Sequence, residues 1–275
     1  MTTSLKEPNL MTIGNTFDHT TGYLISCGDA RIYVEEKGNP ELPVLLMLHG
    51  GFGNVEDFNS IAPALGGRFR LIGIDSRGHG KSGLGTVKLS YESLADDLAK
   101  VINSLELQEF SILGFSDGGI AAYRYAARQD PRLRKIVTVG ARWEMSKDES
   151  AWKIIFGMTG EIWKTNFPSS YESYMHLNPE PDFDRFAADV VDMWTDLSPD
   201  GHPGSLMCQI TNEMLIVRGE NDPLTSLDSM TKLRKHTNHM NLLNIPFAEH
   251  VAFNDAPEVF LRAVGKFFDV ALVSE

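Results

Sequence analysis

The sequence predicts an α/β fold, with a mostly parallel sheet covered by helices on both faces. Two observations carry this prediction. Short, continuous apolar runs, which suit strands buried on both faces, alternate along the chain with amphipathic helical patterns. The runs also end in polar or glycine-rich turns. Because ligands of such sheets bind beyond the carboxyl ends of the strands, we expect function at that edge.

The first elements are short strands. Residues 23–27 and 31–35 alternate in polarity around Gly28-Asp29-Ala30, which predicts an antiparallel hairpin. Six apolar runs follow and predict buried strands at residues 43–48, 70–74, 110–113, 135–139, 214–217 and 241–245. The hairpin therefore precedes a series of strands that we expect to be mostly parallel.

Helical patterns lie between and after these runs. Residues 91–107 place apolar side chains on one face, and Ser90 directly before them is a suitable N-terminal cap. Residues 257–270 show the same periodicity. Strands that alternate with such helices indicate βα units.

One long segment interrupts this alternation. Residues 141–212 contain all four tryptophans and many methionines and other aromatics, without an apolar strand. We predict a core domain of residues 1–140 and 213–275, with a helical cap of residues 141–212 over the carboxyl edge of the sheet. Aromatic and methionine side chains suit an adaptable substrate pocket, so Trp143 and Trp152 are candidate substrate-binding residues. The alternative is that they form the core of the cap itself.

Composition excludes several classes of function. The chain has 275 residues, 42% hydrophobic and 23% charged, which is typical of a well-packed globular protein. A net charge of −12 argues against nucleic acid or an anionic membrane as a partner. Only two cysteines are present, and the first twenty residues lack the apolar core of a signal peptide. We therefore expect a cytoplasmic protein, monomeric or homodimeric, that binds a small molecule.

The third apolar run ends in Gly114-Phe115-Ser116-Asp117-Gly118, directly before a helical pattern. A serine on such a sharp strand-to-helix turn has an exposed hydroxyl, and the glycines allow the backbone to pack closely around it. Because a free hydroxyl is a weak nucleophile, Ser116 needs a base. The motif therefore predicts a nucleophile whose partners lie elsewhere in the chain.

Two later residues have the right chemistry and order to be these partners. His250 follows the last strand and can act as the base, while Asp222 follows the fifth apolar run and can orient its imidazole. Asn221-Asp222-Pro223 is also an ordinary turn signal. Glu144, after the fourth run, is the alternative acid. The order Ser…Asp…His favours Asp222.

An attacked carbonyl would need two hydrogen-bond donors for its developing negative charge. The backbone N–H of Asp117 is one candidate, and that of Gly51 or Phe52, in the turn after His49-Gly50, is the second. We expect His49 to position this turn by hydrogen bonding, since no further ligands stand at metal-binding spacing around it. Asp75 and Arg77 are expected to form a structural link beneath the site. We expect neither a metal nor a cofactor.

Together these motifs resemble those of the α/β-hydrolase superfamily. The resemblance covers residues 43–260 and includes His49-Gly50-Gly51, residues 75–82, Gly114–Gly118, Gly219–Asp222 and His250. It implies the α/β-hydrolase fold, with an eight-stranded sheet and a cap domain. It also implies that Ser116 is the nucleophile, Asp222 the acid and His250 the base.

The elbow Gly114–Ile120 is similar to that of the biphenyl-hydrolase-like proteins. In that group the aspartate beside the nucleophile holds the ammonium group of amino-acid esters, which would make Asp117 a substrate-binding residue here. Asp117 also stands in the first turn of a helix, where a carboxylate is stabilising without any ligand. Both roles are compatible with the sequence.

The expected function is hydrolysis of a small carboxylic ester through an acyl-Ser116 intermediate, and an amino-acid ester is one candidate substrate. Two alternatives use the same residues. One is hydrolysis of a carbon–carbon bond in a diketone-like substrate. The other is a ligand receptor that keeps the three residues and turns over little.

Overall fold

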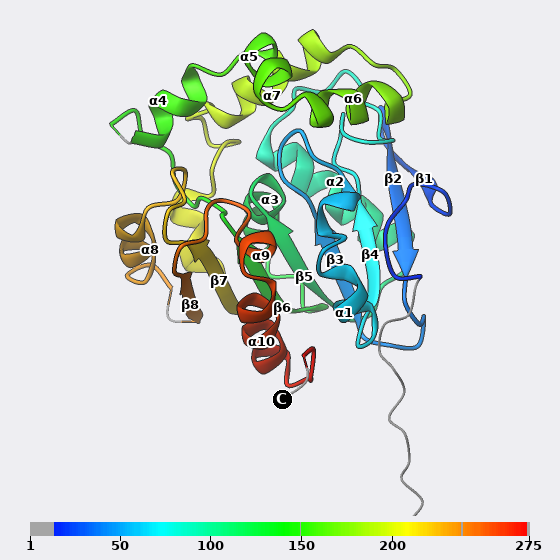
Figure 1. Ribbon diagram of the computed structural model, residues 1–275, viewed down its shortest axis with the longest axis vertical. Helices are drawn as coiled ribbons and strands as arrows, with labels where there is room; N and C mark the ends of the chain where they lie inside the picture. The colour runs from blue at the N-terminus through cyan, green and yellow to red at the C-terminus, as the bar shows by residue number, and fades with distance from the viewer. Residues whose placement is uncertain (1–13, 149, 238, 274–275) are drawn as a thin grey trace, which may run out of the picture.

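The computed structural model describes residues 14–148, 150–237 and 239–273, and the polar residues 1–13 lie outside this part. Over the described residues, eight strands form one sheet in the order β1-β2-β4-β3-β5-β6-β7-β8 (Figure 1). The strands are β1 (Tyr23–Cys27), β2 (Ala30–Lys37), β3 (Val44–Leu48), β4 (Arg70–Ile74), β5 (Phe110–Phe115), β6 (Leu133–Val139), β7 (Glu213–Gly219) and β8 (Met240–Ile245). The predicted fold class is confirmed.

Strand direction follows the pattern of the sequence. β1 and β2 form the predicted antiparallel hairpin, in which Tyr23 pairs with Val34 and Cys27 with Ala30. β2 runs antiparallel to β4, and all the remaining neighbours are parallel. The six continuous apolar runs are the six strands of this parallel part. They are apolar throughout because helices cover both of their faces.

Alternate side chains of the strands enter two separate cores. Leu46, Ile72 and Ile112 belong to the core beneath α2 (Tyr91–Ser104) and α3 (Asp117–Ala126). Their neighbours Leu45 and Leu71 belong to the opposite core. This second core lies beneath η1 (Val55–Phe58), α1 (Ala62–Gly66), α9 (Ala252–Asp255) and α10 (Pro257–Phe268). Figure 1 shows α9 and α10 in front of the sheet and α2 and α3 behind it.

The two predicted helices end slightly earlier than the periodicity suggests. Ser90 caps α2 in a capping box with Ser93, as its position indicates. α2 stops at Ser104, and Glu106 takes a positive φ of 51° that ends the helical path before residue 107. α10 stops at Phe268 because the backbone of Asp269 takes the left-handed helical conformation, which commonly terminates a helix.

Helices fill the segment between β6 and β7. They are α4 (Ser150–Phe156), α5 (Gly160–Asn166), α6 (Pro168–Leu177), α7 (Phe183–Trp194) and η2 (Gly204–Gln209), while α8 (Leu227–Leu233) follows β7. α4 to α7 lie across one end of the sheet in Figure 1. The side-chain amide of Asn178 attaches them there by donating to the carbonyls of Gly78, Gly80 and Ser82.

The helices of the described part of the chain are all too short or too polar to cross a membrane. The predicted division into a core and a cap of residues 141–212 agrees with where β6 ends and β7 begins, and as a division into folding units it stays a prediction.

Candidate active site

Ser116 occupies a strained turn between β5 and α3. Its backbone angles, φ 48° and ψ −116°, lie outside the regions that non-glycine residues ordinarily adopt. Two glycines make the turn feasible by allowing close approach. A Cβ on Gly118 would lie 2.2 Å from the carbonyl oxygen of Leu48, and one on Gly114 would lie 2.7 Å from that of Gly118. The turn holds the Ser116 hydroxyl at the carboxyl end of the sheet.

His250 joins Ser116 to Asp222. Its Nε2 lies 3.0 Å from Ser116 Oγ, and its Nδ1 lies 2.9 Å from Asp222 Oδ2. Because an ionised carboxylate only accepts hydrogen bonds, Nδ1 carries the proton and the lone pair of Nε2 faces the hydroxyl. The structure therefore brings together all three predicted residues, from the ends of β5, β7 and β8.

Asp222 is fixed by the turn that contains it. Its Oδ1 accepts from the backbone N–H groups of Leu224 and Thr225 at 2.8 and 3.3 Å, and Oδ2 also accepts from the Thr225 hydroxyl. Burial raises the pKa of this carboxyl, but the bonds to His250, Thr225 and Leu224 outweigh that effect and lower it. Asp222 is thus an anion at neutral pH. Glu144, the alternative acid, is not the carboxylate that bonds His250.

His49 holds the neighbouring turn in one conformation. Its Nε2 accepts from the backbone N–H of Ser76 at 2.9 Å, so its Nδ1 carries the proton and donates to the carbonyl of Gly50 at 2.7 Å. The ring is fully buried, and this burial lowers its pKa. His49 is therefore a neutral imidazole that orients the turn, in agreement with the prediction.

The turn after His49 lies beside Ser116. A Cβ on Gly50 would be 3.1 Å from Ser116 Cβ, and one on Gly51 would be 2.5 Å from Asp117 Oδ2. Phe52 has a left-handed φ of 59°. Within the described residues, neither the N–H of Phe52 nor that of Asp117, the first residue of α3, donates to a backbone carbonyl. The N–H of Gly51 likewise donates to no backbone carbonyl among the described residues, so all three predicted donors stay candidates.

A cavity of about 40 Å³ opens at Ser116. It is enough for about three water-sized groups, since each needs about 10–15 Å³. Side chains of the core and of the segment between β6 and β7 line it together: Tyr91, Ser116, Asp117, Ile120, Gly140, Arg142, Ile155, Trp194, His202, Leu224 and His250. The cavity suits a short group bound next to the serine.

The carboxylate of Asp117 faces this cavity but already has partners. Tyr91 donates its hydroxyl to Oδ1 at 2.8 Å, and Trp194 donates its indole N–H to Oδ2 at 2.7 Å. Burial raises the pKa of Asp117 to about 6, against the lowering effect of these two bonds and of His250. Asp117 therefore links α2 and α7 to the elbow, which accounts for its position without an ammonium ligand.

Trp143 and Trp152 do not line the cavity. The Trp143 ring is buried against His236, and its indole N–H donates to Ser229 in α8. Trp152 stacks on Phe156, its neighbour one turn along α4. The two side chains stabilise local packing, as the alternative interpretation of the cap tryptophans states.

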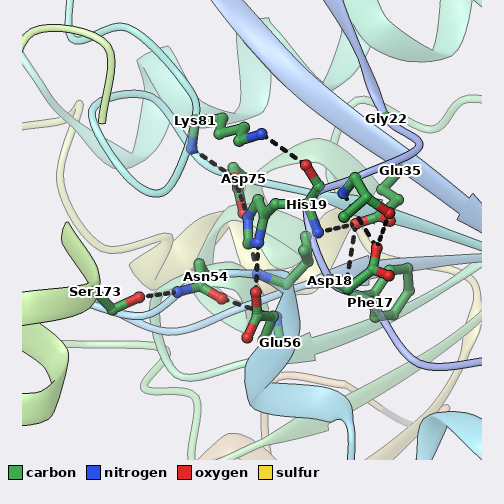
Figure 2. Close-up of polar contacts among 12 residues, drawn as sticks. Phe17, Asp18, His19, Gly22, Glu35, Asn54, Glu56, Asp75, Lys81 and Ser173 are labelled. Atoms are coloured by element: carbon green, nitrogen blue, oxygen red, sulfur yellow. Dashed lines mark hydrogen bonds and ion pairs between the residues drawn. The ribbon is translucent and has the colours of Figure 1, made fainter. Parts of the chain in front are cut away.

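A second polar cluster contains His19, Glu56, Asp75 and Lys81 (Figure 2). His19 Nδ1 is 2.7 Å from Glu56 Oε1, and its Nε2 is 2.8 Å from Asp75 Oδ2. The backbone N–H of Lys81 also donates to Asp75, at 2.8 Å. We refer to these four residues as the His19 cluster.

The expected link between Asp75 and Arg77 is wrong. Asp75 belongs to the His19 cluster and also accepts from the backbone N–H of Val55. Arg77 points toward α2, where it forms a two-pronged ion pair with Asp97 at 2.8 and 2.9 Å and a further bond to Asp29. The two side chains have no partner in common, so closeness in sequence did not bring them together.

The sequence does not single out the three cavity residues of the helical segment that carry polar groups: Arg142, Trp194 and His202. No motif surrounds them, and all three stand in the segment between β6 and β7. Their positions depend on how that segment packs on the sheet. Among the described residues, no group of three or more histidine, cysteine or acidic side chains is placed to hold a metal ion.

Fold and site together define a hydrolase of the α/β class. A family model for the alpha/beta hydrolase fold matches residues 43–193, and the chain belongs to this family. The resemblance inferred from the motifs is thereby confirmed.

Relatives of the chain include several hydrolases. A 2-(acetamidomethylene)succinate hydrolase of Mesorhizobium japonicum is 24% identical over 92% of this chain and 96% of its own length. A pimeloyl-[acyl-carrier protein] methyl ester esterase of Nitrosomonas europaea is 24% identical over 84% and 97%. The solved structure of a meta-cleavage product hydrolase from Pseudomonas fluorescens has a TM-score of 0.74, at 21% identity over 90% and 98%. The structural similarity shows the same fold, and both relatives are hydrolases.

Proposed function

We propose that the protein is a serine hydrolase that cleaves a small carboxylic ester. The observation that carries this proposal is the position of His250, with Nδ1 on Asp222 and the lone pair of Nε2 on the Ser116 hydroxyl. The similarity to a methyl ester esterase supports the ester as substrate. The similarity to a hydrolase of a substituted succinate supports a small acidic substrate.

The proposed reaction begins when His250 Nε2 takes the proton of Ser116 Oγ, which attacks the ester carbonyl carbon. The carbonyl oxygen becomes an oxyanion and accepts from the N–H groups of Asp117 and Phe52, or of Gly51. The C–O bond to the alcohol then breaks, and the alcohol takes the proton from His250. Water, activated by the same imidazole, hydrolyses the acyl-Ser116 ester and releases the acid.

Asp222 acts on this reaction through His250. Its carboxylate holds the imidazole in the required tautomer and stabilises the imidazolium that forms. Asp117 contributes its backbone N–H, while its side chain fixes the elbow against Tyr91 and Trp194. We propose this positioning role for the Asp117 side chain in place of ammonium binding, because Arg142 brings a positive charge to the same cavity.

The test is hydrolysis of a short p-nitrophenyl ester by Ser116→Ala. We expect kcat to fall by about 10⁴-fold or more with the fold unchanged, because the acyl-enzyme cannot form. Ser104→Ala, at the exposed end of α2, is the matched control and should be as active as the wild type. Unchanged turnover in Ser116→Ala would overturn the proposal. Turnover of a diketone but of no ester would replace it with carbon–carbon bond hydrolysis.

A further inference from the structure

The Ser116 cavity contains two polar side chains that the proposed reaction does not use. Arg142 follows β6, where the chain enters the helical segment, and His202 precedes η2, where the chain returns to the sheet. They therefore come from the two stems of that segment. Both line the same small cavity as the serine.

His202 has no hydrogen-bond partner within the described part of the chain. Both ring nitrogens are buried, and neither has an acceptor or a donor in reach. The ring packs edge-on against Tyr91, with centroids 4.9 Å apart, so its orientation is fixed. Leaving buried polar nitrogens unsatisfied is costly, and a site that binds a ligand is a common reason for such a group.

The charges around the cavity indicate which ligand would satisfy His202. Burial, together with the positive charges of Arg142 and Arg124, lowers the pKa of His202 to about 3, so the imidazole is neutral and offers one N–H. Arg142 keeps its positive charge at every ordinary pH. A carboxylate accepts hydrogen bonds only and carries the opposite charge. The carboxylate of Asp117 lines the same cavity, but its two oxygens already accept hydrogen bonds from Tyr91 and Trp194. An alkyl group would leave His202 unsatisfied. An ammonium group would offer no acceptor to the His202 N–H and would be repelled by Arg142.

We propose that Arg142 and His202 form a carboxylate-binding subsite in the Ser116 cavity, and that the substrate is a monoester of a short dicarboxylic acid. The subsite rests on the proposed serine hydrolase function for its place in the reaction. The cavity, at about 40 Å³, holds only a few atoms beside Ser116, so the chain between the two carboxyl carbons must be short. The bound carboxylate would hold the ester carbonyl at Ser116.

Three esters of similar size test the charge preference: monomethyl succinate, the neutral methyl succinamate, and the cationic methyl 4-aminobutanoate. We expect kcat/KM for monomethyl succinate to exceed that for the other two by about 10–100-fold, the rate equivalent of one hydrogen bond to a charged group. Equal values for the first two esters, or a preference for the cation, would overturn the subsite.

Variants connect this preference to the two residues. His202→Phe keeps an aromatic ring against Tyr91 but removes the ring nitrogens. Arg142→Met keeps an unbranched side chain but removes the positive charge. Each should lower kcat/KM for monomethyl succinate about tenfold or more, and should lower kcat/KM for methyl succinamate clearly less. His236→Phe, an exposed histidine outside the cavity, is the control and should change neither ester. An equal loss on both esters would point to a structural role and overturn the proposal.

A binding measurement separates the subsite from the hydrolase function. Calorimetry on Ser116→Ala should detect tighter binding of monomethyl succinate than of methyl succinamate, and His202→Phe in that background should remove the difference. If no ester is hydrolysed by the wild type but this difference is found, the serine hydrolase proposal fails and the subsite stands. If esters are hydrolysed and the two ligands bind alike, the subsite fails alone.

Discussion

His250 and His19 each lie between two oxygen atoms at similar distances, yet their partners give them opposite chemistry. His250 has one carboxylate, Asp222, and one hydroxyl, Ser116, at 2.9 and 3.0 Å. His19 has two carboxylates, Glu56 and Asp75, at 2.7 and 2.8 Å. A hydroxyl can donate a hydrogen bond, whereas an ionised carboxylate cannot.

This difference decides which histidine can act as a base. Both nitrogens of His19 must donate, so the ring is a cation with no lone pair to offer. Its pKa is raised because the bonds to Asp75 and Glu56 outweigh the lowering effect of burial. His250 retains a lone pair on Nε2, directed at the hydroxyl. The role of a buried histidine is therefore set by the oxygen atoms around it, and His19 is a structural cation.

The largest expected contrast is in turnover. His250→Gln should lower kcat for a short ester by about 10⁴-fold or more, because no base remains for Ser116. His19→Gln should keep the wild-type kcat in the folded protein, since the His19 cluster does not touch the serine. Steady-state kinetics on both variants, with circular dichroism to measure the folded fraction, checks this pair. Comparable losses of kcat in both variants would contradict the conclusion that His250 is the base and His19 is a structural cation.

A smaller contrast is expected in stability, and it depends on pH. His19→Gln should lower the free energy of unfolding by about 1.5–3 kcal/mol near pH 6, the value of a hydrogen bond to a charged group. The pKa of His19 is higher in the folded protein than its unfolded value of 6.5. The contribution of the His19 cation to the free energy of unfolding is therefore complete below pH 6.5 and is lost as the pH rises through the folded-state pKa. The difference in the free energy of unfolding between wild type and His19→Gln should therefore decrease as the pH rises.

Urea unfolding at a series of pH values measures this gap. His236→Gln serves as the control, because its exposed ring has neither carboxylate partner of His19. A gap that is constant with pH would mean that His19 is neutral in the folded protein, and the interpretation of the His19 cluster would be wrong.

The sequence predicts the partners of His250 but not those of His19, because apolar runs reveal strands and their ends but do not reveal which loops pack together. Ser116, Asp222 and His250 each directly follow a strand of a parallel sheet, and the carboxyl ends of such strands meet at one edge. Apolar runs reveal those strands, so the fold and the meeting of the three residues could be predicted. His19 lies before β1, and only tertiary packing brings it to Asp75.

The same limit applies around the cavity. Residue type alone predicts Trp143 and Trp152 as substrate-binding residues. In the structure both pack against other side chains, and Trp194 is the tryptophan that bonds Asp117. Arg142 and His202 have no motif, and their meeting depends on how the helical segment docks. Periodicity specifies which face of a helix is buried, but it does not specify which side chains from separate segments share a cavity.

The most direct test of the central claim is to locate a covalent adduct. A fluorophosphonate probe phosphonylates a serine that an adjacent base activates: the serine oxygen bonds to phosphorus and fluoride leaves. Peptide mass spectrometry should find the adduct on Ser116 in the wild type and in His19→Gln, and should find none in His250→Gln. An adduct on another serine, or undiminished labelling of Ser116 in His250→Gln, would contradict the conclusion that His250 activates this serine.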